Sequence, residues 1–319
     1  MVFITKKVIN NKERYYIEYS FRYPNKKLKK VSIYLKNYKI KDKENIIKTY
    51  TPLLKNKEKE LLIEYTLNKY KNNHIFNKKI IKELEESRLE YKKIIKSINK
   101  QQFKDILNRF TINFTYESNA LEGNSLTLKD VTLILYENIT IKDKDLREIY
   151  ETKNTRKAME LVFQNKFKIN KKDIIKLHSI LIENTGISKG FKKLPNHLLM
   201  RNLETTPPEK VESKVDELIK WYNQEENLHP LEKATIFHGK FEKIHPFQDG
   251  NGRTGRMLIN IMLIKNNYPP LIIRKNQRIS YFSALEAFDY KHEDKLKRFM
   301  IEKYKNTFEK FFKIYIKYL

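Results

Sequence analysis

The chain has 319 residues, of which 40% are hydrophobic and 12% aromatic, and this composition argues for a packed core and against a disordered chain. Its formal net charge is +27, and the absence of cysteine excludes disulfides, thiolate metal sites and a cysteine nucleophile. No apolar run of transmembrane length and no signal-peptide pattern occur, so we expect a soluble cytoplasmic protein with no membrane role.

The first 40 residues are expected to form a small antiparallel β unit. Hydrophobic and polar residues alternate over 15–23, and apolar patterns also cover 2–8 and 31–35, with turn signals between these stretches. The tyrosines and lysines of this unit could bind single-stranded nucleic acid through stacking and charge. Packing of the tyrosines against a helix is the simpler interpretation, and the lysines are spread along the whole chain instead of forming one basic arm.

Residues 41–110 are expected to form a helical N-terminal region. Hydrophobic residues keep helical spacing over 46–54, and Asn77 is a suitable N-cap for a long helix that follows it. No proline or glycine occurs between Lys55 and Phe110, so we expect no flexible linker there. The best domain boundary therefore lies near residue 40.

Helices dominate the prediction for the rest of the chain. A helix that begins at Pro230 is expected to end near His245, because Pro246 disfavours helical backbone at the residue before it. Residues 190–206 contain glycine and proline signals and are expected to be extended or to form a hairpin. The remaining predicted helices cover 128–136, 143–164, 171–183, 209–223, 253–264, 278–288 and 292–318.

A predicted helix end near residue 122 places two polar side chains on one face. Ser118 and Glu122 are four residues apart, which aligns them along a helix. Gly123 suits the end of that helix, and Thr127 with Asp130 forms a capping pair for the next one. Taken alone, Glu122 is an ordinary surface acid near a helix end.

The stretch from His245 to Arg256 combines the residue types needed to handle phosphate groups. It contains three of the seven glycines of the chain. Gly250, Asn251 and Gly252 lie at the N-terminus of a predicted helix, where free N–H groups and the helix dipole favour an anion. Arg253 and Arg256 would offer forked donors to further phosphate oxygens.

Two more residues of this stretch suggest a metal and a base. Asp249 is a hard oxygen ligand, placed where a Mg²⁺ that bridges phosphates would sit. His245 could accept a proton from an attacking hydroxyl. The combination predicts transfer of a phosphate or nucleotidyl group from a triphosphate nucleotide, although no P-loop pattern is present. A competing interpretation places His238, His245 and Asp249 on one hydrolytic metal, but these residues span a helix-to-loop break and no HExxH pattern occurs.

Residues 245–256 resemble the signature of the Fic family, HxFx(D/E)GNGRxxR, and match every fixed position. The resemblance extends over roughly 111–290 and implies an all-helical Fic core, so that the chain is mainly α, with 291–319 as a C-terminal helix. It implies transfer of AMP from ATP, with Mg²⁺, to a Ser, Thr or Tyr hydroxyl of a protein substrate, possibly the chain itself; a homo-oligomer stays possible.

The resemblance also implies a role for each residue of the signature. His245 would deprotonate the hydroxyl and Asp249 would hold Mg²⁺. Gly250, Asn251 and Gly252 would form the anion hole. Arg253 would support the phosphates, and Arg256 would bind the γ-phosphate. Outside the signature, Tyr281 resembles a family contact to adenine, and 190–206 would be the flap that aligns the target chain.

Ser118 to Gly123 resemble the inhibitory motif of the family, [S/T]xxxE[G/N], which implies that Glu122 pairs with Arg256 and leaves ATP misaligned. In some relatives the same glutamate helps to remove AMP from the target. Two alternatives therefore stay open. The first is de-AMPylation, or transfer from another nucleotide, at the same site. The second is a nucleic-acid-binding protein in which the Fic core is accessory.

Overall fold

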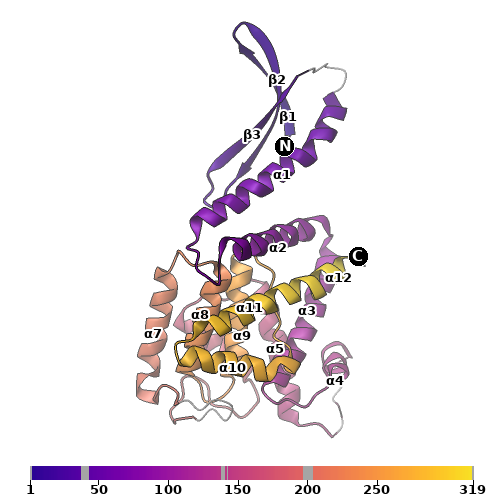
Figure 1. Cartoon of the computed structure of the whole chain (residues 1–319). Helices are drawn as coiled ribbons and strands as arrows, with labels where there is room; N and C mark the ends of the chain where they lie inside the picture. The colour runs from indigo at the N-terminus through magenta and orange to yellow at the C-terminus, as the bar shows by residue number, and fades with distance from the viewer. Residues whose placement is uncertain (1, 37–42, 138–140, 142, 197–203, 318–319) are drawn as a thin grey trace. The chain divides into compact units, whose positions relative to one another are not determined.

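The structure is a computed structural model that describes residues 2–36, 43–137, 141, 143–196 and 204–317 (Figure 1). The chain divides into two compact units, Met1–Lys71 and Asn72–Leu319. The first contains the three strands and one helix, and the second contains the candidate site.

The first unit is a three-stranded antiparallel sheet with a helix, α1 (Lys43–Lys69). The strands β1 (Val2–Ile9), β2 (Lys12–Arg22) and β3 (Leu28–Leu35) pair in chain order, with β2 in the centre. Asn10 and Asn11 both have positive φ values, 52° and 53°, which gives the β1–β2 turn a backbone twist that matches the strands. The predicted β unit is therefore confirmed.

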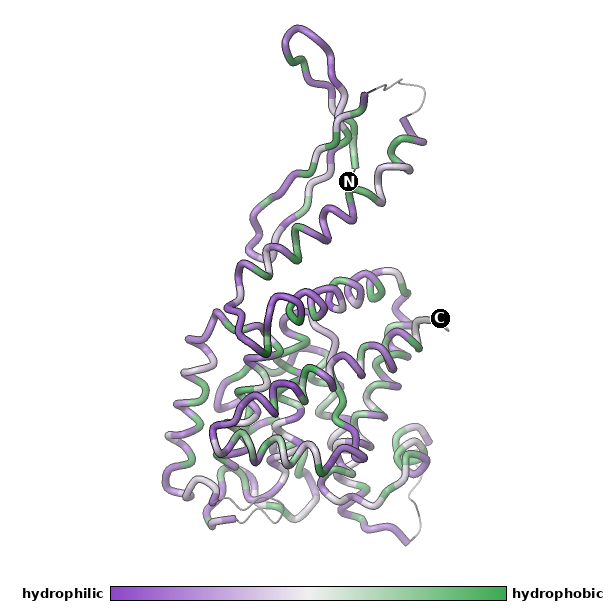
Figure 2. Tube along the Cα trace, viewed as in Figure 1, coloured by the Kyte–Doolittle hydropathy of each residue, from purple (hydrophilic) through white to green (hydrophobic). Residues whose placement is uncertain are grey.

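The core of this unit explains why α1 belongs with the strands. One face of the sheet buries Ile17, Tyr19 and Phe21, and Leu54 of α1 is buried in the same cluster. In Figure 2, hydrophobic and hydrophilic stretches alternate along α1, as expected of a helix that buries one side. Since an isolated small sheet has little stability in water, the helix completes the unit. The structural division thus falls after Lys71, whereas the sequence suggested a boundary near residue 40.

The second unit is built from helices. Its elements are α2 (Lys78–Ser97), α3 (Lys100–Leu121), α4 (Leu128–Thr132), η2 (Leu133–Glu137), α5 (Leu146–Phe163), α6 (Lys171–Leu181), α7 (Pro208–Gln224), α8 (Pro230–Ile244), α9 (Asn251–Lys265), η3 (Lys275–Gln277), α10 (Arg278–Asp289), α11 (Glu293–Thr307), η4 (Phe308–Phe312) and α12 (Lys313–Lys317). The predicted boundary near residue 110 falls inside α3, and the division of the helical part at 110 and 290 stays a prediction. Of the helices that the structure describes, none is long and apolar enough to cross a membrane.

Helices α8 and α9 form the centre of this unit and carry the loop of the candidate site between them. Both are buried along most of their length. Glycine allows them to pack closely, because a Cβ atom at Gly255 would lie 2.6 Å from Glu242 Oε1 on α8. The loop 245–250 therefore starts and ends on two helices that are fixed against each other.

The local signals in the sequence are confirmed where they can be checked. The side chain of Asn77 accepts a hydrogen bond from Ile80 N, and Thr127 and Asp130 form a reciprocal capping box. Pro230 lies in the first turn of α8. The predicted extended segment 190–206 lies between α6 and α7, and its residues 197–203 are outside the described part of the chain.

Candidate active site

His245 ends α8 in a left-handed backbone conformation, with φ 50° and ψ 61°. This region is sparsely populated by residues other than glycine and asparagine, and it turns the chain sharply out of the helix. The backbone N–H of His245 still donates to Phe241 O at 2.9 Å. The imidazole Nδ1 lies 4.0 Å from Glu242 Oε2, and most of its side chain is buried. The predicted base is thus held at the start of the signature loop.

The loop after His245 is fixed by the side chain of Asn251. Its Oδ1 accepts from Phe247 N and its Nδ2 donates to Phe247 O, both at 2.8 Å. Thr254 Oγ1 donates to Gly250 O at 2.8 Å, and Gly250 itself has φ 78°. The side-chain amide of Asn251 therefore holds Phe247, and the backbone N–H of Asn251 begins α9, where it is placed for a phosphate contact.

A buried histidine from another helix supports the same loop. The ring of His178, on α6, stacks on Phe247 with centroids 3.7 Å apart and an angle of 4°. Its Nε2 lies 3.0 Å from Asp249 O, as expected if it donates a hydrogen bond. Burial lowers the pKa of His178 to about 4, so the imidazole is neutral at physiological pH.

The first turn of α9 is in contact with the carboxylate of Glu122. The N–H groups of Asn251, Gly252 and Arg253 begin this helix, and no earlier helical turn provides carbonyls for them. A Cβ atom at Gly252 would lie 2.1 Å from Glu122 Oε1 and 2.9 Å from Arg256 Nη1. An anionic group therefore already lies beside the predicted phosphate cradle.

Arg256 brings the two halves of the predicted inhibitory pair together. Its guanidinium is 2% exposed, and Nη2 donates to Glu122 Oε1 at 2.7 Å. Nε donates to Ser118 Oγ at 3.0 Å, and Nη2 also donates to Ser118 O at 2.8 Å. The sequence predicted this juxtaposition of Ser118, Glu122 and Arg256 across 134 residues, and the structure contains it.

The end of α3 that carries Glu122 is fixed to the rest of the unit. Glu117 accepts hydrogen bonds from Lys275 N at 2.7 Å and from Arg274 Nη1 at 3.3 Å. Arg278 Nε donates to Leu121 O at 3.0 Å, which satisfies a carbonyl at the helix end. Glu122 therefore projects from a rigid support.

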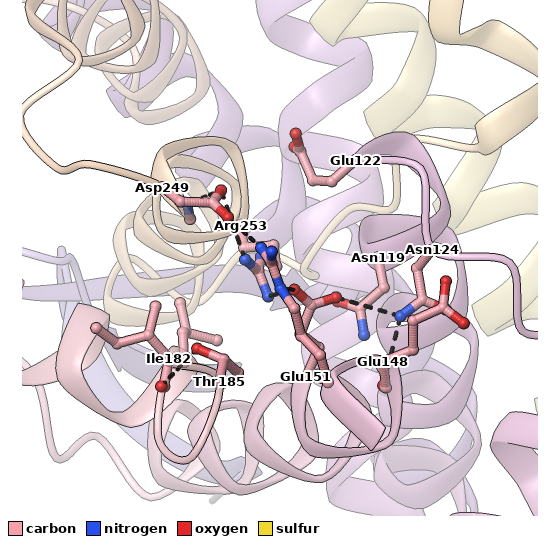
Figure 3. A network of polar contacts seen from close by, with 12 residues as sticks. Asn119, Glu122, Asn124, Glu148, Glu151, Ile182, Thr185, Asp249 and Arg253 are labelled. Atoms are coloured by element: carbon pink, nitrogen blue, oxygen red, sulfur yellow. Dashed lines mark hydrogen bonds and ion pairs between the residues drawn. The ribbon is translucent and has the colours of Figure 1, made fainter. Parts of the chain in front are cut away.

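Asp249 belongs to a network of alternating charges (Figure 3). Arg253, 2% exposed, pairs with Glu151 Oε1 at 3.1 Å and lies 3.8 Å from Asp249 Oδ1. Arg147 pairs with Asp249 Oδ2 and, at 3.2 Å, with Glu151 Oε1. Burial favours a higher pKa for Asp249, but Arg253, the N–H of Gly250 and Arg147 outweigh it and hold the pKa below its usual value.

Asp249 fits a cation that arrives with a nucleotide. Among the described residues, no three His, Cys, Asp or Glu side chains gather as a metal cluster. The competing arrangement of His238, His245 and Asp249 on one hydrolytic metal is therefore not present. Mg²⁺ commonly uses one or two carboxylates together with water and substrate phosphates. Asp249, whose side chain is 44% exposed at the start of the cradle, suits that mode.

Tyr281 lies away from any open surface. It is 1% exposed, its hydroxyl lies 2.7 Å from His238 Nε2, and its ring stacks on Phe299. Burial raises the pKa of its hydroxyl. In this arrangement the ring offers no exposed face to adenine, so its predicted contact with the base stays a hypothesis.

The described ends of the predicted flap are held beside the signature loop. Lys192 Nζ donates to Asn196 Oδ1 and to Thr205 Oγ1, both at 2.7 Å. Lys192 N donates to Pro246 O, and Asn196 Nδ2 donates to Phe247 O, both at 2.9 Å. Burial lowers the pKa of Lys192 to about 8.

Sequence reasoning missed four residues that support the site: Arg147, Glu151, His178 and Lys192. Each is far from residues 245–256 in the chain, and each has an ordinary local context. Arg147 and Glu151 form an i, i+4 pair, which is a weak signal because such pairs are common on helix surfaces.

Residues 168–263, which include the loop, α8 and most of α9, match the Fic/DOC family. This part of the chain is therefore similar to Fic domains, as the signature at 245–256 indicated. Protein adenylyltransferase fic-1 of Caenorhabditis briggsae is 29% identical over 181 residues, and protein adenylyltransferase Fic of Drosophila virilis is 32% identical over 176 residues. Each alignment covers 54% of this chain and 36% of the relative, so the chain matches little more than a third of their length.

The fold is similar to that of a solved Fic-domain structure. A Fic-domain-containing signaling protein from Bacteroides thetaiotaomicron superposes with a TM-score of 0.62 and 25% sequence identity. The match covers 72% of this chain and 96% of that chain. The predicted fold class, a mainly α chain with a Fic core and a small N-terminal antiparallel sheet, is confirmed.

Proposed function

We propose that this chain is a protein adenylyltransferase that transfers AMP from ATP to a Ser, Thr or Tyr hydroxyl of a protein, and that Glu122 inhibits it. The observation that carries this proposal is the contact of Glu122 with Arg256 and with the first turn of α9. A helix N-terminus followed by two buried arginines is an anion site. The similarity to two proteins named adenylyltransferases supports the choice of reaction.

The geometry suggests a role for each group in the reaction. His245 takes the proton of the target hydroxyl, whose oxygen then attacks the α-phosphorus of ATP. The bond from that phosphorus to the bridging oxygen breaks, and pyrophosphate leaves. The N–H groups of residues 250–252, with Arg253 and Arg256, stabilise the charge on the phosphate oxygens. Asp249 would hold Mg²⁺, which would neutralise charge on the phosphates when bound.

Inhibition follows from competition for one guanidinium. Arg256 cannot give Nη2 both to Glu122 and to a γ-phosphate with good geometry. ATP that binds while Glu122 stays in place therefore lacks this contact, and its α-phosphate is not aligned with His245. Removal of the carboxylate frees Arg256 and makes the site competent.

The test is incubation of the full chain with Mg²⁺ and ATP radiolabelled on its α-phosphate, followed by mass spectrometry of the labelled protein. We expect an added mass of AMP on a hydroxyl residue, faster labelling by Glu122→Gly, and none by His245→Ala. Equal labelling by His245→Ala and wild type would exclude the mechanism.

Two outcomes would favour the alternatives at the same site. If removal of AMP from a labelled target is the main activity, Glu122→Ala destroys that activity instead of raising labelling. If the donor is another nucleotide, a panel of nucleotides labelled on the α-phosphate shows a preference other than ATP.

A second candidate function, binding of single-stranded nucleic acid, is favoured by the exposed face of the sheet. On this face the rings of Tyr16 and Tyr34 lie 5.4 Å apart, with Lys7 and Arg14 over them. The acid of β2 on this face is Glu18, whose side chain is buried and paired with Lys7 and Lys30. The face therefore presents aromatic rings with net positive charge, which suits bases and phosphates.

This second candidate is tested by fluorescence anisotropy of the full chain with a labelled thymidine oligonucleotide at physiological ionic strength. Replacement of Tyr16 and Tyr34 by Ser should weaken binding by about tenfold or more. The matched control is Lys59→Gln, an exposed charge on α1. Binding that disappears after modest salt addition, or that is the same in all variants, would indicate nonspecific charge alone.

A further inference from the structure

Arg147 occupies the carboxylate that the proposed function assigns to Mg²⁺. Its guanidinium pairs with Asp249 Oδ2, and the other oxygen of the same carboxylate faces Arg253 and the N–H of Gly250. Both oxygens of Asp249 are thus engaged by donors of this chain. A cation at Oδ2 competes with the Arg147 guanidinium, because two positive charges at one carboxylate oxygen repel each other.

Arg147 is placed so that it can move without a large cost. Its side chain is 47% exposed and that of Asp249 is 44% exposed. Exposed ion pairs contribute little to stability, since water and salt screen them and two long side chains must be ordered. Arg147 also keeps a second partner, Glu151, which accepts from its Nε at 3.2 Å.

Arg253, by contrast, is fixed in the network. It is 2% exposed and pairs with Glu151 Oε1 at 3.1 Å (Figure 3). Of the two arginines around Asp249, the exposed Arg147 is therefore the one that a cation can displace.

We propose that Arg147 is a positioning residue that competes with the divalent cation for Asp249. The inference rests on the proposed function, in which Asp249 holds Mg²⁺. Two residues of the proposed nucleotide site are then engaged in ion pairs within the chain: Arg256 pairs with Glu122, and Asp249 pairs with Arg147. The two contacts share no residue, so release of Glu122 alone leaves Arg147 on the carboxylate.

The test compares nucleotide affinity with and without Mg²⁺, because this difference reports the cation at Asp249 independently of turnover. Calorimetry with α,β-methylene-ATP, which cannot transfer AMP, gives the ratio of the two dissociation constants for the full chain. We expect the ratio of the dissociation constant without Mg²⁺ to that with Mg²⁺ to rise by up to about fivefold in Arg147→Gln, the limit that an exposed ion pair supports, and by less in Arg147→Lys.

Matched controls separate this effect from a general change of charge or fold. Arg156→Gln removes the same charge from the same helix α5, where Arg156 pairs with Glu160 at i, i+4, and it should leave the ratio unchanged. Asp249→Asn should abolish the effect of Mg²⁺ with or without Arg147.

The outcomes are distinct. A ratio in Arg147→Gln that equals that of wild type, or a loss of affinity that is the same with and without Mg²⁺, overturns the inference and makes Arg147 a plain phosphate contact or a surface residue. If Asp249→Asn keeps the full effect of Mg²⁺, the assignment of the metal ligand in the proposed function fails as well. The transfer reaction itself is judged separately by the labelling of His245→Ala.

Discussion

Replacement of Glu122 by glutamine removes the negative charge beside Arg256 while it keeps the shape of the side chain at position 122. In the structure Arg256 makes three hydrogen bonds, two to Ser118 and one of 2.7 Å to Glu122 Oε1. The two bonds to Ser118 do not depend on the charge of residue 122. The substitution therefore removes the ion pair but leaves a hydrogen bond from the charged arginine, which stays in place.

The size of the effect follows from this single bond. Glutamine keeps the hydrogen bond and loses only the ion pair, and ion pairs with a solvent-accessible partner contribute up to about 1 kcal/mol. This free energy corresponds to about a fivefold change in an equilibrium. The side chain of Glu122 is 32% exposed, so solvent screening limits the effect to this size or less. When the inhibited state dominates, the rate of AMP transfer rises by the same factor.

The assay is the initial rate of labelling from ATP radiolabelled on the α-phosphate, at saturating ATP and Mg²⁺. Glu122→Gln should label up to about fivefold faster than wild type, and Glu122→Gly, which removes the whole side chain, should label faster still. Glu160→Gln, an exposed acid of α5 that pairs with Arg156, is the matched control and should label like wild type. Labelling by Glu122→Gln at or below the wild-type rate would refute competition at Arg256 as the cause of inhibition.

Further predictions concern the cradle, a buried ion pair and the flap. Gly252→Ala should weaken nucleotide binding by about tenfold or more in calorimetry, because its methyl group would lie 2.1 Å from Glu122 Oε1, in the space of the cradle. The double variant Gly252→Ala, Glu122→Gly tests the position of the phosphates: if it binds nucleotide normally, the phosphates lie elsewhere. Burial favours a higher pKa for Glu85, but His229, Arg88 and Tyr268 outweigh burial and lower the pKa from 4.5 to about 2. The ionised Glu85 therefore stabilises the fold fully above pH 4.5, and this stabilisation is lost as the pH falls through about 2. Glu85→Gln should then cost about 3 kcal/mol in urea unfolding at neutral pH, with a smaller difference from wild type in acid; an unchanged midpoint at neutral pH would contradict this. Lys192, with a pKa of about 8, should lose a proton, and with it a hydrogen-bond donor to the flap, as the pH rises through that value. The rate of labelling should therefore decline near pH 8 in wild type but not in Lys192→Arg, whose guanidinium stays charged. An equal decline in both proteins would assign the titration to another group.

The sequence was most informative where function depends on consecutive residues. The loop 245–256 lies on a helix N-terminus because Pro246 ends one helix and the glycines start the next, and both effects are local. Ser118 and Glu122 share a face because they are four residues apart on a helix, which is again a local relation. The strands near the N-terminus were predicted from their period-two pattern for the same reason.

The sequence was least informative where function depends on packing between distant segments. Arg147 meets Asp249 across 102 residues, and nothing in the local sequence of either predicts the pair. Tyr281 resembles a family contact to adenine, and α10 packs its ring against His238 and Phe299, so that the side chain is buried. The assignment of α1 to the first unit depended likewise on a shared core, because no compositional change marks residue 71.

The position of Glu122 before Arg256 in the chain has a consequence for biosynthesis. Ribosomes add roughly 5–20 residues per second, so the 134 residues between the two take roughly 7–27 seconds to make. Helix α3 is therefore complete before the arginine that it restrains has been synthesised. A newly made chain therefore contains Glu122 before Arg256 is added, and translation that stops before residue 256 yields a chain without this arginine.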